Sequence, residues 1–314
     1  MALVRSAYLD ARRKAAIGVI VAFLVPACHP KLAVQTHPPP AQWPHTVEHV
    51  IIVTLDGLRA DEVGDERTPI LQRMIDEGAS TLAAQTVSPS LTLPAHSSLV
   101  TGLTPDQHHI VWNKYKPEMG NLEAPTIFDV ARRNGMTTAF VSGKEKLRHI
   151  VQPDAVDLCS IEMRRDGPVM DEALDHLHSQ RPNLMLIHLP DVDRAGHLAG
   201  WKSARQRRTL QEADRLVGRL LDSIENLEMR DSTVVIVSAD HGGEDRNHRN
   251  NTETDVVTIP WIVWGDSIEP RELAPVSITA TANTTLRLLG IEPPSDWIAR
   301  EVEAFPAGLS AAAP

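Results

Sequence analysis

Hydrophobic and polar positions along the chain form blocks whose spacing alternates between strand and helix. The β-branched run HVIIVTL at 49–55 predicts a strand, and TPILQRMIDEGA at 68–79 has the apolar spacing of a helix. The same alternation continues to Gly290, which is expected to end the last helix. Further strands are predicted at 80–87, 136–142, 183–189, 232–240 and 257–265, and further helices at 94–102, 124–135, 169–179, 203–229 and 280–290. This order predicts an α/β fold with a mostly parallel central sheet and helices on both faces.

The first 28 residues have the pattern of an export signal. Four basic residues precede the apolar run AAIGVIVAFLVPA at 15–27, which is short for a membrane span. The string VPAC resembles the lipobox of bacterial lipoproteins and predicts lipidation of Cys28. An uncleaved anchor helix is the alternative. We therefore expect an exported protein of the periplasm or cell envelope, which contacts the membrane only through this N-terminal anchor.

The rest of the chain is predicted to be one domain on a tether. Prolines crowd residues 29–47 and favour an extended linker. Residues 48–306 are long enough to bury one core, and 307–314 form a short tail. The net charge of -10 excludes a general nucleic-acid-binding surface, which would be basic.

Acids and histidines stand where predicted strands end. Asp56 follows the first strand, Asp193 and His197 follow the strand at 183–189, and Asp240 precedes His241 after the strand at 232–240. An Asp after one strand is often only a turn former or a cap. Recurrence at three strand ends, with His248 shortly after the third, instead indicates a centre for divalent cations. Gly196 predicts a backbone turn that lets Asp193 and His197 converge on one ion.

At these residues the chain resembles the alkaline phosphatase superfamily, and most closely its type I phosphodiesterase/nucleotide pyrophosphatase branch. The strings that carry the resemblance are LDGLRAD at 55–61, TLPAHSSLVTGLTPDQHHI at 92–110, DRAGH at 193–197, ADHGG at 239–243 and IPW at 259–261. The resemblance implies an alkaline phosphatase-like fold for the domain at 48–306 and a metal-dependent phosphohydrolase activity.

The resemblance also implies two bound Zn²⁺ ions, or other divalent cations in their place. Asp193, His197 and His248 would hold one ion. His188, on the strand before Asp193, is an alternative to His248. Asp56, Asp240, His241 and the oxygen of Thr92 would hold the other ion.

Thr92 is the expected nucleophile, because coordination to a divalent cation activates a hydroxyl without a neighbouring base. It stands before Pro94 at the predicted start of a helix, where backbone N–H groups would face a phosphoryl oxygen. The structural alternative is that Thr92 only caps this helix. Asn113 matches the family's Asn that donates its side-chain amide to a phosphoryl oxygen, although an Asn in a loop is also a common turn former.

The substrate class is less sharply indicated. Lys144 and Lys146 lie in GKEKLR, which resembles phosphonoacetate hydrolases, and two extra cations suit a dianionic substrate. A solvated lysine pair is the alternative. The sequence predicts a hydrolase of small phosphate esters, phosphodiesterase-like, with a phospho-threonine intermediate. Alternatives are a phosphomonoesterase, a phosphonoacetate-type C–P hydrolase, and an inactive binding protein with a zinc core.

Overall fold

The computed structural model describes residues 47–64, 66–152, 154–297 and 302. All described residues belong to one compact unit. The predicted signal segment 1–28 with Cys28, most of the predicted linker and the predicted tail 307–314 lie outside the described residues. Within the described part, no helix is both long and apolar enough to cross a bilayer.

A single sheet forms the centre of the described unit, with the strand order β4-β3-β5-β1-β6-β7-β2-β8. Strands β4, β3, β5, β1 and β6 run parallel, and β7 is antiparallel to both of its neighbours. The mostly parallel sheet predicted from the sequence is confirmed. The strands are β1 His49–Leu55, β2 Ala79–Gln85, β3 Thr138–Ser142, β4 Leu158–Ile161, β5 Leu184–Leu189, β6 Thr233–Ser238, β7 Thr258–Trp264 and β8 Arg271–Glu272.

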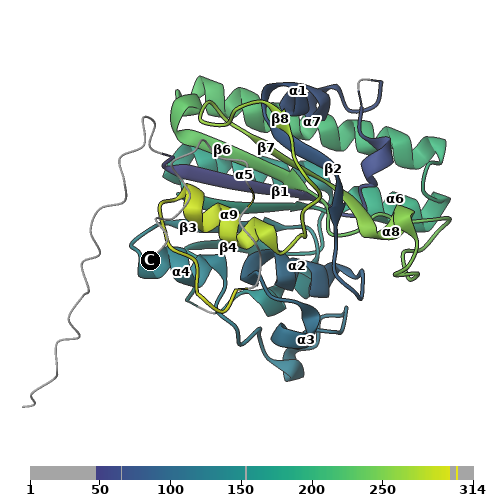
Figure 1. Cartoon of the computed structure of the whole chain (residues 1–314), viewed down its shortest axis with the longest axis horizontal. Helices are drawn as coiled ribbons and strands as arrows, with labels where there is room; N and C mark the ends of the chain where they lie inside the picture. Colours follow the sequence, from purple (N-terminus) through teal and green to yellow (C-terminus); the bar gives the residue numbers. More distant parts are fainter. Residues whose placement is uncertain (1–46, 65, 153, 298–301, 303–314) are drawn as a thin grey trace, which may run out of the picture. The chain divides into compact units, whose positions relative to one another are not determined.

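Helices cover both faces of this sheet (Figure 1). One layer contains α1 Pro69–Glu77, α5 Asp166–Gln180, α6 Asp191–Ala199 and α7 Ala204–Asn226. The other contains α2 Thr92–Thr101, α3 Pro105–His108, α4 Ile127–Arg133 and α9 Ala280–Leu288. The short elements are α8 Thr254–Val257 and the 3-10 turns η1 Ala60–Glu62, η2 Pro117–Met119, η3 Glu145–Ile150 and η4 Arg230–Ser232.

The central strands are apolar runs because both of their faces are covered. β1, β5 and β6 are buried along their whole length. Between their first residues and their carboxyl ends these strands are apolar, and the register aligns the polar residues near the carboxyl ends in one row. Ser142 of β3 pairs with His188 of β5, His188 with Thr54 of β1, and Thr54 with Ser238 of β6. Asp56 and Asp240, which carry the candidate chemistry, follow Thr54 and Ser238 of this row by two residues.

Several elements were not predicted from the sequence, among them β4, β8 and α6. β4 is a short edge strand whose Cys159 is exposed, and β8 has only two residues, so neither carries a continuous apolar run. Helix α6 was missed because its sequence, DVDRAGHLA, combines charged residues with a glycine. α6 is the element that carries Asp193 and His197.

Candidate metal and phosphoryl site

The predicted ligand residues gather at one edge of the sheet. Asp56 directly follows β1, Asp240 and His241 follow β6, and α6 begins two residues after β5 ends. Because β5, β1 and β6 are adjacent and parallel, their carboxyl ends bring these segments together. The sequence prediction of a shared site outside the strand ends agrees with this arrangement.

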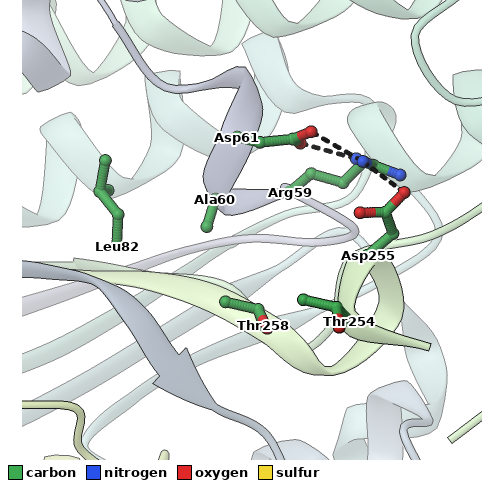
Figure 2. A pocket seen from close by; sticks show the side chains of 7 residues that line it. All are labelled: Arg59, Ala60, Asp61, Leu82, Thr254, Asp255 and Thr258. Atoms are coloured by element: carbon green, nitrogen blue, oxygen red, sulfur yellow. Dashed lines mark hydrogen bonds and ion pairs between the residues drawn. The ribbon is translucent and has the colours of Figure 1, made fainter. Parts of the chain in front are cut away.

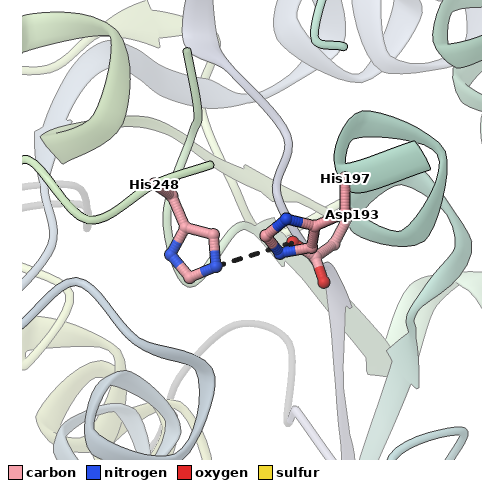
Figure 3. Close-up of side chains that lie close together, drawn as sticks. All are labelled: Asp193, His197 and His248. Atoms are coloured by element: carbon pink, nitrogen blue, oxygen red, sulfur yellow. Dashed lines mark ion pairs between the residues drawn. The ribbon is translucent and has the colours of Figure 1, made fainter. Parts of the chain in front are cut away.

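Asp193, His197 and His248 form the first group, and their ligand atoms lie within 4.8 Å of one another. Figure 3 shows the two imidazoles turned toward the same carboxylate. The Oδ1 of Asp193 is 3.3 Å from Nε2 of His197 and 3.8 Å from Nε2 of His248. Three converging groups of this type can hold one divalent cation.

The predicted backbone turn at Gly196 is wrong. Gly196 lies inside α6, and Asp193 and His197 meet because residues four apart share one face of a helix. The glycine has a different reason. A Cβ at this position would lie 2.7 Å from the indole of Trp201, so only glycine lets the ring pack against the helix.

The second group consists of Asp56, Asp193 and His241, so Asp193 belongs to both groups. Asp240 is adjacent, with its Oδ2 3.4 Å from Nε2 of His241. The Oδ1 of Asp240 accepts from the backbone N–H groups of Gly57 and His241, which leaves Oδ2 to face the group. Asp56, Asp240 and His241 of the set implied by the resemblance therefore lie together here, with the addition of the shared Asp193.

His188 does not join either group. Its Nε2 lies 2.8 Å from Oδ2 of Asp56, and its Nδ1 faces Ser142. The imidazole therefore supports the Asp56 carboxylate from behind. Of the two candidates for a third ligand beside Asp193 and His197, His248 has the suitable position.

Each histidine of the two groups is held by its Nδ1. His197 donates to the backbone oxygen of Arg246, His248 to that of Ser90, and His241 to that of Gly242. A carbonyl oxygen only accepts, so the proton sits on Nδ1 and Nε2 keeps its lone pair. Such bonds orient imidazoles for metal binding.

The Lys144 ammonium lies among the carboxylates. Nζ is 2.7 Å from Oδ2 of Asp56, 2.6 Å from Oδ2 of Asp193 and 3.3 Å from Oγ1 of Thr92. Burial alone would raise the pKa of Asp56, but Lys144 and His188 outweigh burial and hold that pKa well below its usual range. For Lys144, burial would lower the pKa, and Asp56 and Asp193 raise it instead. Lys144 is thus engaged by the site's own acids.

The buried carboxylates of this site outnumber the buried cation beside them, so bound metal ions would balance their charge. One lysine faces three carboxylates, and burial together with Asp56 raises the pKa of Asp240 to about 7. Among the described residues, four buried atoms that point into the groups have no hydrogen-bond partner: Asp56 Oδ1, Asp193 Oδ1, Asp240 Oδ2 and His241 Nε2. Buried acceptors without partners are costly, and divalent cations would satisfy them. The residues therefore fit the two-ion centre that the resemblance implies.

Thr92 is the first residue of α2, as predicted, but its side chain is not a cap. The N-cap residue is Leu91, and its side chain makes no cap hydrogen bond. The Thr92 hydroxyl is buried beside Lys144. Asn113 contacts the same helix start, since its Oδ1 accepts from the N–H of Leu93 at 3.0 Å.

Lys146 approaches the site from η3, and its Nζ lies 3.1 Å from Oδ1 of Asn113. Burial and the neighbouring Lys144 lower the pKa of Lys146 to about 8. Neither lysine is a solvent-exposed surface residue, because Lys144 is 8% exposed and Lys146 is partly buried. The alternative of a solvated lysine pair is therefore wrong.

Arg59 was overlooked in the sequence, although it stands inside the LDGLRAD string. Its guanidinium is buried and binds Asp61 and Asp255 at 2.8 and 2.7 Å, and the backbone oxygen of Gly243 at 2.8 Å. Figure 2 shows it between these two acids, at a cavity of about 260 Å³. Arg59 thus ties the loop after β1 to the loop that carries His241. The sequence feature that could have indicated a role for Arg59 is its place in the LDGLRAD string, three residues after Asp56.

Fold and site together define an α/β protein of the alkaline phosphatase type. Within that class, the chain belongs to the type I phosphodiesterase/nucleotide pyrophosphatase family, whose sequence model matches residues 50–263. An uncharacterised pyrophosphatase/phosphodiesterase of Schizosaccharomyces pombe is 29% identical over 214 residues, which cover 62% of this chain and 44% of that protein. The chain spans about half or less of the length of the curated relatives it matches.

Solved structures share the fold. Murine ectonucleotide pyrophosphatase/phosphodiesterase 5, an inactive variant in complex with AMP, superposes with a TM-score of 0.66 at 14% identity, covering 79% of this chain and 96% of that chain. An alkaline phosphatase superfamily protein of Vibrio parahaemolyticus has a TM-score of 0.65 at 19% identity, covering 84% and 71%. At these identities the likeness concerns the fold alone.

Proposed function

We propose that this protein is a metal-dependent hydrolase of small phosphate esters, and that phosphodiesters or pyrophosphates of the nucleotide type are its substrates. Membership of the family supports this proposal. Two Zn²⁺ ions are the proposed cofactors, one held by Asp193, His197 and His248, the other by Asp56, Asp240, His241 and Thr92.

One observation carries the proposal. The Thr92 hydroxyl lies at the start of α2, is not used as a cap, and is 3.3 Å from the Lys144 Nζ that also contacts Asp56 and Asp193. A structural metal site needs no such hydroxyl, because protein ligands close it completely. A buried threonine beside two ligand groups has the position of a nucleophile that attacks phosphorus.

The chain's own residues supply the rest of the chemistry. Thr92 Oγ1 would attack phosphorus, the ester oxygen would leave, and water would then cleave the phospho-threonine. Two divalent cations would supply charge stabilisation to the attacking and leaving oxygens. Asn113 keeps its amide N–H group for a phosphoryl oxygen, because its Oδ1 already accepts from Leu93 and Lys146.

A phosphomonoesterase or phosphonoacetate-type C–P hydrolase is the second candidate. Lys146 favours it, since its ammonium lies beside Asn113 and could meet a second negative charge on the substrate. Lys144 is bound by Asp56 and Asp193 and is less available for this role. An inactive zinc-containing binding protein is the third candidate, and detectable turnover of nitrophenyl phosphates would exclude it.

For the location we propose export, with Cys28 as the acylated anchor and 29–47 as the tether. The basic residues, the apolar run and VPAC support this proposal. Mass spectrometry of the protein from membranes tests it, because acylation gives a mature chain that starts at a lipidated Cys28. A mature chain that retains its first residues would favour the uncleaved anchor helix.

The function is tested by kcat/KM of zinc-loaded protein for bis(p-nitrophenyl) phosphate, p-nitrophenyl phosphate and phosphonoacetate. Preference for the diester supports the main proposal, and preference for the monoester or the phosphonate supports the second. Thr92→Ala should lower turnover by about four orders of magnitude. Full activity of this variant would refute the nucleophile. Denaturing quench should trap phosphate on the wild-type Thr92 and not on Thr92→Ala.

A further inference from the structure

The indole of Trp201 contacts all three segments that supply the ligand groups. Trp201 follows α6 and is 7% exposed. Its Nε1–H donates to the backbone oxygen of Gly57 at 2.8 Å, directly after Asp56. Its backbone N–H donates to the oxygen of Asp245 at 2.7 Å, in the loop that leads to His248.

Two glycines make room for this ring. An added Cβ would lie 2.7 Å from the indole at Gly196 and 2.2 Å from it at Gly243. Real Cβ atoms do not approach so closely. The ring is therefore packed between α6, which carries Asp193 and His197, and the loop that begins with His241. Gly196 of DRAGH and Gly243 of ADHGG therefore both make room for the Trp201 ring.

The ring also meets both histidines of the first group. Its centroid is 5.3 Å from that of His197 at 82° between the planes, and 6.1 Å from that of His248 at 68°. The side chain of His197 is 45% exposed and stands near the end of α6, so packing from the buried interior is limited. The Trp201 edge contact restricts the rotation of this imidazole.

Hydrogen bonds to the loop residues Asp245 and Arg246 also restrict the His197 imidazole. His197 donates Nδ1–H to the oxygen of Arg246, whose neighbour Asp245 is held by the Trp201 backbone. A shift of Trp201 would therefore move the bond partner of His197 together with the loop that carries His248.

We propose that Trp201 is a positioning residue for the ion held by Asp193, His197 and His248. This inference rests on the proposed function. Trp201 acts through the two imidazoles and does not touch the substrate. Its removal should weaken this ion's binding more than that of the ion held by Asp56, Asp240 and His241. The ring contacts two ligand imidazoles of the first group directly, whereas its contacts on the side of the second group are to Gly57 and Gly243, which are not ligands.

The test is calorimetric titration of metal-stripped full-length protein with Zn²⁺. We expect two binding events in the wild type. Trp201→Phe keeps a ring but loses the Nε1–H donor, and should weaken one event about tenfold. Trp201→Leu should weaken the same event by about a hundredfold, in line with the usual effect of residues that orient ligands. Gly196→Ala, which displaces the indole without removing it, should affect the same event.

Trp261→Phe is the matched control. Trp261 is fully buried in β7 and donates its Nε1–H to the Thr281 side chain at 3.0 Å, so the same atoms are lost at an indole whose bond partner is not next to a ligand residue. We expect this variant to lose stability but to bind both ions as the wild type does. Two unchanged events in Trp201→Phe and Gly196→Ala, or an equal loss in Trp261→Phe, would overturn the proposal. A wild type that binds no zinc would instead refute the proposed function.

Discussion

The Nε2 of His188 lies 2.8 Å from Oδ2 of Asp56, and both side chains are completely buried. The bond fixes the Asp56 carboxylate so that its Oδ1 faces the second ligand group. We predict that His188→Phe, which keeps an aromatic ring but removes the donor, weakens zinc binding by about 10- to 100-fold.

Competition with a chromophoric chelator measures this effect. His178→Phe is the control, because His178 lies on α5 and bonds only the oxygen of Leu174 among the described residues. Unchanged zinc affinity in His188→Phe would show that the bond does not orient Asp56.

Metal removal should lower stability. Asp56, Asp193 and Asp240 share one lysine, so added cations relieve repulsion between buried carboxylates. Zinc at a hundredfold excess over its dissociation constant should stabilise the fold by about 2.7 kcal/mol per site, and chelation should reverse the gain.

Scanning calorimetry with and without zinc checks this prediction. In Asp193→Asn, which alters the carboxylate shared by both groups, most of the zinc-dependent rise in Tm should vanish. A wild-type Tm that does not respond to zinc would contradict a buried cation site.

Lys146 should give a pH signature if it binds a second substrate charge. Burial and Lys144 lower its pKa to about 8, so the ammonium is present below pH 8 and is lost as pH rises through 8. A phosphate monoester keeps both charges above about pH 7. The ratio of monoester to diester kcat/KM should therefore fall between pH 7 and 9.

Lys146→Ala should flatten this profile and reduce the ratio at pH 7. Lys114→Ala, an exposed lysine next to Asn113, is the control and should leave the ratio unchanged. If the wild-type ratio of monoester to diester kcat/KM did not change with pH, Lys146 would have the role of orienting Asn113 and not of binding the substrate. Replacing both Lys144 and Lys146 by Ala should reduce monoester or phosphonate turnover far more than diester turnover, and equal losses would count against the substrate role.

Asp166 predicts a pH-dependent stability away from the site. It is buried at the start of α5 against Asp191, and burial and that neighbour raise its pKa to about 8 from 3.8. The folded state therefore holds a proton that the unfolded state has lost. The free energy of unfolding should fall as pH rises from about 4 to 8, by at most about 1.4 kcal/mol per pH unit.

Urea unfolding of wild type and Asp166→Asn between pH 5 and 8 measures this slope. The amide resembles the protonated acid and can still accept from the N–H of Asp191, so the variant should be less sensitive to pH. Asp171→Asn, an exposed acid on the same helix, should keep the wild-type slope. A constant difference between wild type and Asp166→Asn would show that Asp166 is ionised in the fold.

The sequence by itself determined the architecture and the composition of the site. Apolar runs such as HVIIVTL and TVVIVS predict strands covered on both faces, and their ends place Asp56 and Asp240 at one edge. The central strands and long helices agree with prediction because period and burial are local properties of the sequence. The short edge strands β4 and β8 were not predicted, because hydrogen bonding to β3 and β2 defines them and their sequences contain no apolar run.

Only the tertiary structure decided how the ligand residues are shared and supported. Asp193 joins two groups, His188 supports Asp56, and Lys144 lies between carboxylates from β1 and α6, which are contacts across distant parts of the chain. Gly196 was predicted to form a turn, but it lies inside α6 and, with Gly243, accommodates the Trp201 ring. Side-chain packing between segments has no periodic signal in a single sequence, so the partners of each residue emerge only once the sheet brings the segments together.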